Sequence, residues 1–415
     1  MKKKGGPVPE KGIIDKHLEA AGLALPDLDF DDTEKTFSHL SDKELKRSAM
    51  LFKFMNKRWL TNILSPLGMW AVRWNLPFAA WFVKKTIYPQ FVGGSSLVSS
   101  IPAIERLYER GVFSLLDYGA EGKESEEDFN ISQREIMAGV EFAARQASVP
   151  VVTCKVTSLA RNALLEDLQA SEFVFTPELQ REYDGVIRRM DSICNVAHRH
   201  GVKIFFDAEE SWFQDTIDRM VRVMMKRYNK ERVIVYNTFQ LYRHDRLDFL
   251  IASHEEAQKE GYMLGAKLVR GAYMDKERER AEKIGYPSPI QPTLAATHDA
   301  FNAAVRYCLD HYKTLASCNA SHNRASVQLQ AGLIAARNYP RDHEHLNFCQ
   351  LYGMSDNLTF NLAEAGFNVA KYLVYGPVRE VTPYLIRRAQ ENTSVTGDAS
   401  RELKLVLAEI KRRKL

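Results

Sequence analysis

From about residue 96 onward, the chain alternates between short apolar runs and longer amphipathic stretches. The apolar runs are nearly continuous, which is typical of strands that are buried on both faces of a parallel sheet. Amphipathic stretches such as 184–201 and 246–261 lie between them and indicate helices. The alternation therefore predicts βαβ units. Eight apolar runs are present, at residues 111–119, 149–156, 201–209, 232–239, 265–273, 313–321, 346–353 and 369–376.

Eight such units over roughly 300 residues favour a closed barrel over an open, doubly wound sheet. We therefore expect an α/β fold, a (βα)8 TIM-like barrel preceded by an N-terminal helical arm. The predicted parts are an N-terminal arm (1–95), polar at first and then helical and rich in tryptophan, a catalytic barrel (96–395) and a C-terminal helical tail (396–415).

The predicted N-terminal arm has two parts that differ in composition. Residues 1–40 are polar and mixed, which predicts a loosely held segment. Ser41 and Glu44 have the spacing of a capping box and predict the start of a helix. Four of the five tryptophans follow in residues 59–91: Trp59, Trp70, Trp74 and Trp81. They can fill a groove on the barrel, or they can meet a membrane or partner surface, because tryptophan with basic neighbours suits the headgroup zone.

Composition narrows the class of protein. Of 415 residues, 45% are hydrophobic and 27% are charged, as in ordinary globular proteins. The net charge of +4 is too small to suggest nucleic acid. Five cysteines without a CxxC motif argue against a disulfide framework and fit a reducing compartment. The basic start MKKKGG has no apolar run after it, so we expect a cytoplasmic protein, with peripheral contact to the inner face of a membrane as the open alternative.

Polar residues cluster where the predicted strands end, which is where barrel enzymes carry their chemistry. The set mixes carboxylates, cations, an amide and a histidine without the ligand pattern of a metal site, so we predict no metal. No GxGxxG follows the first strand, and neither GxxxxGK[ST] nor GxSxG occurs. The strand-end residues are Asp117, Glu121, Lys155, Asp207, Glu209, Gln240, Arg270, Tyr273, His322, Asn323, Leu351 and Tyr372.

Two adjacent arginines, Arg387 and Arg388, lie in the stretch VTPYLIRRAQEN (381–392), which has the pattern of a helix. A solvated helix face is the ordinary explanation for such a pair. The alternative is a clamp, because the planar guanidinium fork matches a carboxylate with two hydrogen bonds. These twelve residues alone leave both explanations open.

Five motifs give the chain a resemblance to the proline dehydrogenase family, in particular to the monofunctional, mitochondrial-type group of proline and hydroxyproline dehydrogenases. The resemblance extends over about residues 113–395, and together the motifs are highly specific. They are FFDAEES (205–211), KLVRGAYMDKE (267–277), ASHN (320–323), CQLYGM (349–354) and YLIRRAQEN (384–392).

The resemblance implies a distorted (βα)8 barrel that binds FAD non-covalently at its C-terminal face. It implies oxidation of L-proline to Δ1-pyrroline-5-carboxylate, with hydride transfer from proline C5 to flavin N5 and electron transfer to a quinone. This is the first step of proline catabolism to glutamate. Since no aldehyde dehydrogenase domain follows residue 394, a separate pyrroline-5-carboxylate dehydrogenase is the expected downstream partner.

The resemblance also implies roles for individual residues. The substrate set, which includes the arginine clamp, comprises Glu121, Lys155, Asp207, Tyr273, Leu351, Tyr372, Tyr384, Arg387 and Arg388. The FAD set comprises Asp207, Gln240, Lys267, Val269, Arg270, Gly271, Ala272, His322, Asn323 and Glu391. Two positions depart from the bifunctional members of the family: Lys267 stands where they have arginine, and Met274 stands where they have a tryptophan against the adenine.

Two alternatives to a proline dehydrogenase follow from the same residues. Hydroxyproline dehydrogenases of the family resemble this chain but carry a small serine where Tyr372 stands, so Tyr372 favours proline. A non-enzymatic relative that keeps the barrel as a binding module is the second alternative. The intact set of Lys155, Asp207, Arg387 and Arg388 argues against it.

Overall fold

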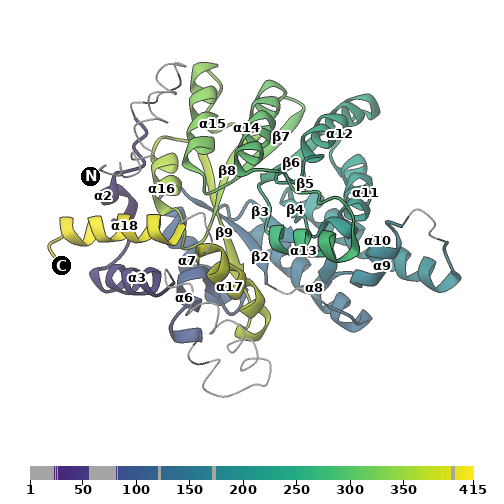
Figure 1. Cartoon of the computed structure of the whole chain (residues 1–415), viewed down its shortest axis with the longest axis horizontal. Coiled ribbons are helices and arrows are strands. Elements are labelled where there is room, and N and C mark those ends of the chain that lie inside the picture. The colour runs from purple at the N-terminus through teal and green to yellow at the C-terminus, as the bar shows by residue number, and fades with distance from the viewer. Residues whose placement is uncertain are drawn as a thin grey trace, which may run out of the picture.

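The computed structural model describes residues 23, 25, 27–55, 81, 83–119, 123–170, 174–393 and 398–415 (Figure 1). Its centre is a closed barrel of eight parallel strands, one for each predicted apolar run. These strands are β2 (Phe113–Tyr118), β3 (Val151–Cys154), β4 (Lys203–Phe206), β5 (Val235–Gln240), β6 (Leu264–Val269), β7 (Leu315–Ala320), β8 (Leu346–Leu351) and β9 (Asn368–Tyr375).

The barrel closes through β9, which pairs with β8 on one side and with β2 on the other. Tyr372 shows the closure directly, since it is in register with Leu351 of β8 and with Leu115 of β2. The predicted (βα)8 barrel is therefore confirmed. A further short strand, β1 (Val92–Gly94), pairs with the end of β9 and was not predicted, because three residues with two glycines give no hydrophobic pattern.

Alternate residues of each strand face two separate cores. Leu115, Val151 and Phe205 point into the barrel, where they belong to an inner cluster. Their neighbours Leu116 and Val152 point outward, into the larger cluster between strands and helices. Both faces of each strand are thus buried, which explains why the strand runs are continuously apolar.

Helices surround the barrel and alternate with its strands (Figure 1). Their order agrees with the βαβ pattern expected from the sequence. They are α7 (Leu97–Tyr108), α8 (Glu126–Ala143), α9 (Asn162–Asp167), α10 (Pro177–His200), α11 (Ser211–Tyr228), α12 (Arg246–Glu260), α13 (Met274–Ile284), α14 (Leu294–Asp310), α15 (Arg324–Ala336), α16 (Asp356–Glu364) and α17 (Val378–Thr393), with a 3-10 turn η1 (Val156–Ser158) after β3.

The described part of the N-terminal arm contains α2 (Thr33–Phe37), α3 (Asp42–Met55) and α6 (Tyr88–Phe91). The predicted capping box at the start of α3 is confirmed, because the Ser41 amide donates to Glu44 Oε2 at 2.9 Å and the Glu44 amide donates to Ser41 Oγ at 3.3 Å. The expectation of a loosely held segment is wrong for residues 27–40. Phe30 is fully buried, and its carbonyl accepts a hydrogen bond from Asn357 Nδ2 at 2.9 Å.

The C-terminal helix α18 (Asp398–Arg412) packs against α3 and α2 beside the barrel, as Figure 1 shows. Arg413 fastens this contact by donating to the carbonyl oxygens of Phe37 at 2.7 Å and Leu40 at 2.8 Å. Helices α2, α3 and α18 therefore form one layer beside the barrel.

The tryptophan-rich segment lies mostly outside the described residues, which exclude Trp59, Trp70 and Trp74. Trp81 is described and is 60% exposed. Among the described helices, none combines the length and the apolar composition that crossing a bilayer requires. Both alternatives for the tryptophan-rich segment, packing in a barrel groove and contact with a membrane surface, stay predictions.

One buried histidine gives the fold a testable pH dependence. His254 of α12 is fully buried, with Nδ1 3.0 Å from the Tyr307 hydroxyl and Nε2 2.9 Å from Thr314 Oγ1. Burial lowers its pKa to about 4, and His311 adds to the shift. The unfolded chain takes up a proton near pH 6.5, whereas the folded protein does so only near pH 4. Stability should therefore fall as the pH decreases from 6.5 to 4.

We predict that His254→Gln makes this part of the pH profile shallower, by at most about 1.4 kcal/mol per pH unit. Urea unfolding at several pH values between 7.5 and 4 measures the slope. An identical slope in wild type and His254→Gln would show that His254 does not titrate as its burial requires.

Candidate active site

Polar side chains line the inside of the barrel near the C-terminal ends of its strands. Each of them alternates with an outward-facing residue on its own strand, so strand geometry alone turns it inward. Asp117, Thr153, Asp207, Lys267 and Tyr372 are all buried and come from five different strands or strand ends. A barrel interior is normally filled by apolar layers. This polar layer is therefore the first sign of a functional site.

Asp207 is the centre of that layer. Its Oδ1 accepts a hydrogen bond from Lys267 Nζ at 2.6 Å, and its Oδ2 accepts one from the Tyr372 hydroxyl at 2.8 Å. Lys267 Nζ also lies 4.9 Å from the centroid of the Tyr372 ring. Asp207, Lys267 and Tyr372 thus fix one another, and the lysine charge is already paired inside the barrel.

The pKa values of the two interior carboxyl groups, Asp207 and Asp117, are shifted in opposite directions. Burial acts to raise the pKa of Asp207, but the charges of Lys267 and Lys155 and two hydrogen bonds outweigh it, so the pKa lies below its usual value. Burial raises the pKa of Asp117, Lys155 opposes this shift, and the negative charge of Asp207 adds to it. Thr153 Oγ1 donates to Asp117 Oδ1 at 2.8 Å. The environment therefore favours the charged form of Asp207 more than that of Asp117.

Lys155 lies on a turn that Glu209 holds in place. It precedes η1, and its carbonyl accepts hydrogen bonds from the Ser158 amide at 3.0 Å and from Ser158 Oγ at 2.7 Å. Glu209 grips the same turn, because its carboxylate accepts from the Thr157 amide at 3.1 Å and from Thr157 Oγ1 at 2.5 Å. Burial raises the pKa of Glu209 to about 7, although Thr157 and Lys155 oppose the shift.

Gln240 ends β5 and faces the barrel interior next to this turn. Its Nε2 donates to the carbonyl oxygen of Glu209 at 2.7 Å. Glu209 therefore joins the two parts of the site, its carboxylate holding the Lys155 turn and its carbonyl holding the Gln240 amide.

Arg388 does not lie on a solvated helix face. Arg388 is only 8% exposed, and its guanidinium carbon lies 5.4 Å from the centroid of the Tyr384 ring, one turn earlier on α17. Tyr273 lies in the turn between β6 and α13. Burial raises the pKa of Tyr273, and the positive charges of Lys155 and Arg387 partly oppose this shift. The charges of Arg387 and Lys155 therefore both act on Tyr273. A carboxylate grip by the two arginines stays a prediction.

A second group of site residues, centred on Arg270, lies between β6 and β7. Arg270 directly follows β6, and its guanidinium donates to Ser321 Oγ at 2.7 Å and to Ser326 Oγ at 2.9 Å. Ser326 belongs to the first turn of α15, which Asn323 caps by accepting a hydrogen bond from the Ser326 amide at 3.0 Å. A helix N-terminus beside a guanidinium has the donors that bind phosphate oxygens.

Gly271 follows Arg270 with a φ of +137°, which L side chains rarely adopt. A Cβ atom at this position would lie 2.5 Å from the Tyr242 ring. Only glycine therefore lets the backbone pass Tyr242 so closely. The neighbouring Val269 ends β6, and Ala272 is exposed.

His322 connects the group around Arg270 to the C-terminal helix α18. Its Nδ1 lies 2.9 Å from Ser355 Oγ, and its Nε2 accepts a 3.4 Å contact from the Leu351 amide. Ser355 has a φ of +50°, which is uncommon for a residue other than glycine. The buried Glu402 of α18 holds it there by accepting from the Ser355 amide at 3.0 Å. Helix α18 is therefore part of the wall behind Leu351 and His322.

Two predicted site residues cannot be placed. Glu121 lies outside the described residues, and Glu391 falls within α17 where its side chain is not described. The other predicted residues lie on the barrel strands, on the turns that follow them or on α17.

Sequence reasoning left out several residues that the structure brings into this region. Asp117 and Glu209 carried a signal, since they stand at strand ends, but the selected set omitted them. Thr153 could have been found from alternation, because it lies two residues before Lys155 on the same face. Nothing in the sequence marks Glu402, whose role depends on how α18 packs.

Comparisons with known proteins agree with the sequence motifs. The family model for proline dehydrogenase matches residues 100–401. Proline dehydrogenase 1, mitochondrial, of Dictyostelium discoideum is 31% identical over 432 residues, covering 92% of this chain and 74% of that protein. The Drosophila melanogaster protein of the same name is 39% identical over 247 residues, covering 57% of this chain and 36% of that protein. The match thus spans about a third of the fly protein's length.

Among solved structures, the chain resembles proline utilization A (PutA) from Bdellovibrio bacteriovorus, crystallised after inactivation by N-propargylglycine. The TM-score is 0.69 with 19% identity, over 93% of this chain and 41% of that chain. At this identity the likeness shows the fold, and it agrees with the closed barrel described above.

The comparisons correct one expectation. A cytoplasmic protein was expected because no apolar run follows the basic start of the sequence. The Dictyostelium and Drosophila relatives are both named as mitochondrial, which points to mitochondria instead of the cytoplasm. The cytoplasmic expectation is therefore wrong, because it rested on a feature of the first residues that says nothing about organelles.

The Asp207–Lys267 pair gives a stability prediction. Lys267→Met leaves a buried carboxylate without its main partner, so we expect the free energy of unfolding to fall by about 3–5 kcal/mol. Urea denaturation measures the loss. Lys276→Met is the matched control, because Lys276 pairs with Glu210 on the surface and such pairs contribute about 1 kcal/mol or less. Equal losses in the two variants would contradict the central role of this pair.

Proposed function

The chain belongs to the proline dehydrogenase family, and from this premise we propose that it oxidises L-proline to Δ1-pyrroline-5-carboxylate with FAD as cofactor. This reaction is the first step of proline catabolism to glutamate. The observation that supports it most directly is the placement of Arg387 and Arg388. Arg388 is buried on α17, and the charge of Arg387 acts on Tyr273, which also lies in reach of the Lys155 charge.

The arginine pair suits the carboxylate of an amino acid. Lys267 cannot serve as a second general anion site, because its ammonium group is bound to Asp207 at 2.6 Å. We therefore assign the substrate carboxylate to Arg387 and Arg388 and not to Lys267. Bidentate pairing with a guanidinium would orient the proline ring as well as hold it.

The same cations favour the reactive form of the substrate. Free proline carries an ammonium group, and the neutral amine is the better hydride donor. Arg387, Arg388 and Lys155 bring positive charge to one region, which lowers the pKa of a nearby ammonium group. The residues of the site therefore help to hold the proline nitrogen in its neutral form.

The ring of proline needs apolar walls around the carboxylate grip. Tyr273 and Tyr372 are buried aromatic residues, and Leu351 at the end of β8 is in register with Tyr372 of the neighbouring strand β9. Tyr372 is held in one orientation, because its hydroxyl donates to Asp207 Oδ2 at 2.8 Å. A fixed aromatic wall leaves little room for an added ring hydroxyl, which favours proline over hydroxyproline.

The residues on the other side of the site fit FAD. Arg270 and the N-terminus of α15 provide donors for the pyrophosphate, and Gln240 provides an amide for the edge of the isoalloxazine. We assign Val269, Gly271, Ala272, His322 and Asn323 to the same surface. The chemistry that FAD supplies when bound is acceptance of a hydride from proline C5 at flavin N5 and transfer of the electrons to a quinone.

The partners follow from the reaction. We propose a quinone as the electron acceptor and a separate pyrroline-5-carboxylate dehydrogenase as the enzyme that consumes the product. Anaerobic mixing of the purified protein with L-proline, followed by flavin absorbance, tests the proposal. We expect a yellow protein that L-proline bleaches faster than trans-4-hydroxy-L-proline does. A colourless protein, or a flavin that L-proline leaves oxidised, would favour the non-enzymatic alternative.

We predict that Arg387→Met and Arg388→Met each raise the KM for proline and lower kcat/KM by roughly tenfold to a hundredfold, since each removes a charge-assisted contact. Bound flavin should stay near the wild-type amount. Arg379→Met is the matched control, because Arg379 is an exposed arginine on the same helix. Proline kinetics that are unchanged in both arginine variants would remove the clamp from the site.

Specificity gives the next prediction. Tyr372→Ser should raise the ratio of kcat/KM for hydroxyproline to that for proline, because it opens space at the ring wall. Tyr372→Phe removes only the hydroxyl that binds Asp207, so it should keep the wild-type ratio while it lowers stability. Steady-state kinetics with both substrates separate the two effects. The same ratio in the serine variant as in the wild type would place Tyr372 away from the substrate.

A further inference from the structure

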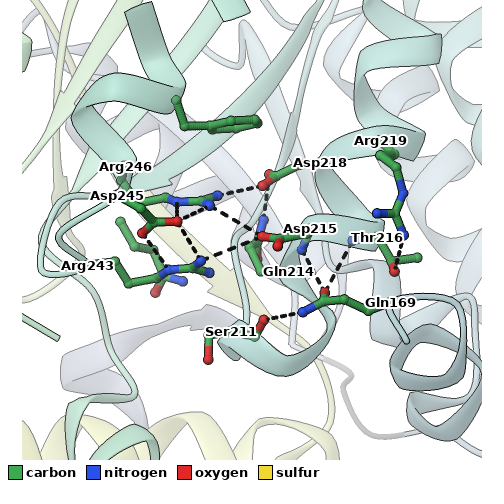
Figure 2. Close-up of polar contacts among 12 residues, drawn as sticks. Gln169, Ser211, Gln214, Asp215, Thr216, Asp218, Arg219, Arg243, Asp245 and Arg246 are labelled. Carbon is green, nitrogen blue, oxygen red and sulfur yellow. Dashed lines mark hydrogen bonds and ion pairs between the residues drawn. The ribbon is translucent and has the colours of Figure 1, made fainter. Parts of the chain in front are cut away.

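A buried ion pair lies behind the barrel wall, outside the residues assigned above. Asp218 of α11 and Arg246 of α12 are 4% and 5% exposed, and Arg246 Nη1 donates to Asp218 Oδ2 at 2.7 Å. Figure 2 shows the two side chains pointing toward each other from neighbouring helices. A buried pair costs desolvation energy, and it is kept most readily where it fixes the geometry of something else.

Asp218 fixes the direction of two amide side chains. Its Oδ1 accepts hydrogen bonds from Gln214 Nε2 and from Asn237 Nδ2, both at 2.8 Å. A carboxylate only accepts hydrogen bonds, so both amides must turn their NH2 groups toward it. Asn237 belongs to β5, and its Oδ1 in turn accepts from the Thr238 amide at 2.9 Å. Asp218 thus connects α11, α12 and β5.

The direction of Gln214 determines what it offers on its other side. Because its Nε2 binds Asp218, its Oε1 faces the Glu209 amide and accepts from it at 2.7 Å. The carbonyl of Glu209 then accepts from Gln240 Nε2, also at 2.7 Å. Gln214 and Gln240 are 1% and 2% exposed, so water does not take the place of these partners.

We propose that Asp218 is a positioning residue for the cofactor site, which sets the orientation of the Gln240 amide through Gln214 and the backbone of Glu209. The inference rests on the proposed function, since Gln240 is assigned there to the edge of the flavin. The chain of contacts runs from Arg246 to Asp218, Gln214, Glu209 and Gln240. At its inner end, the Gln240 NH2 group is held toward Glu209, which leaves Oε1 as the amide's acceptor for other donors.

Asp218→Asn breaks this order without changing the size of the side chain. The new amide has one oxygen and one NH2 group, whereas three donors need acceptors at this point. If the oxygen stays with Gln214 and Asn237, the NH2 group faces the guanidinium of Arg246. If it turns to Arg246, Gln214 loses its acceptor and can flip, which sets two donors against each other at the Glu209 amide.

Asp245 offers a matched control in the same cluster. Its carboxylate binds Arg246 Nη2 and Arg243, with Arg243 Nη2 at 2.8 Å, and within the described part of the chain its contacts do not extend to Gln214 or Gln240. Figure 2 shows it on the outer side of the network. Asp245→Asn therefore disturbs the same arginine while it leaves Asp218 and Gln214 in place.

The test measures FAD affinity by titrating flavin-depleted protein, and turnover of L-proline in the reconstituted protein. We expect Asp218→Asn to weaken FAD binding by about tenfold, as for loss of one well-placed hydrogen bond. Asp245→Asn should change it by less than about twofold, since its contacts do not reach Gln240. The KM for proline should stay near the wild-type value in both variants, because the arginine pair is untouched.

Two further variants separate positioning from a general loss of structure. Gln214→Met keeps the ion pair but cuts the link, so it should weaken FAD binding as Asp218→Asn does. Gln240→Leu removes the end of the chain, and Asp218→Asn should add little to it if both act through one group. The exchange variant Gln214→Glu/Asp218→Asn restores an acceptor at each donor except that of Asn237, and should recover FAD affinity to within about threefold.

The outcomes discriminate between the inference and the proposed function. Equal effects of Asp218→Asn and Asp245→Asn on FAD binding, or effects of Asp218→Asn and Gln240→Leu that simply add, would overturn the inference alone. Wild-type protein that binds FAD but leaves L-proline unoxidised would overturn the proposed function alone. If Asp218→Asn fails to fold, Gln214→Met decides, and wild-type FAD affinity in that variant would refute the inference.

Discussion

A charged carboxylate inside a closed barrel is the constraint on which this structure depends. Lys267, which binds Asp207 at 2.6 Å, the charge of Lys155 and the Tyr372 hydroxyl together favour the charged form of Asp207 against the cost of burial. Removing Lys267 or the Tyr372 hydroxyl leaves a polar atom without a partner where water is scarce. The side chains of Asp207, Lys267 and Tyr372 come from β4, β6 and β9, so the interaction also ties distant strands of the barrel to one another.

This constraint shapes the electrostatics of the whole barrel mouth. Because Lys267 and Asp207 neutralise each other, the carboxylate grip that we propose depends on Arg387 and Arg388 of α17. Asp117 sits close to the Asp207 charge, and burial together with that charge raises its pKa. The site is therefore divided into a neutral floor and a cationic rim. Such a division suits a ligand with one carboxylate and an apolar ring.

The sequence predicted the barrel well because its signal is repeated. Eight continuous apolar runs, each buried on both faces, leave few other arrangements, and the structure shows all eight as strands. Strand-end position also identified Asp207 and Gln240. The sequence could not show that Lys267 binds Asp207, that Glu209 joins two turns or that Glu402 supports Ser355. Those contacts depend on helix packing and rotamers, which periodicity does not record. Phe30 was misjudged because a single aromatic residue among polar ones gives no pattern.

The packing of α18 against α3 has a consequence for the folding of the chain during its synthesis on the ribosome. Helix α3 leaves the ribosome early, with an apolar face that includes Leu45 and Phe52, whereas α18 is made only after the last barrel strand. Strand β9, which closes the barrel, and α17, which carries the arginine pair, also arrive late. The nascent chain therefore exposes apolar surface throughout most of its synthesis. Closure of the barrel by β9, the arginine pair on α17 and the cover of α3 by α18 all come near the end. Chaperones that bind apolar segments should meet this chain mainly through α3.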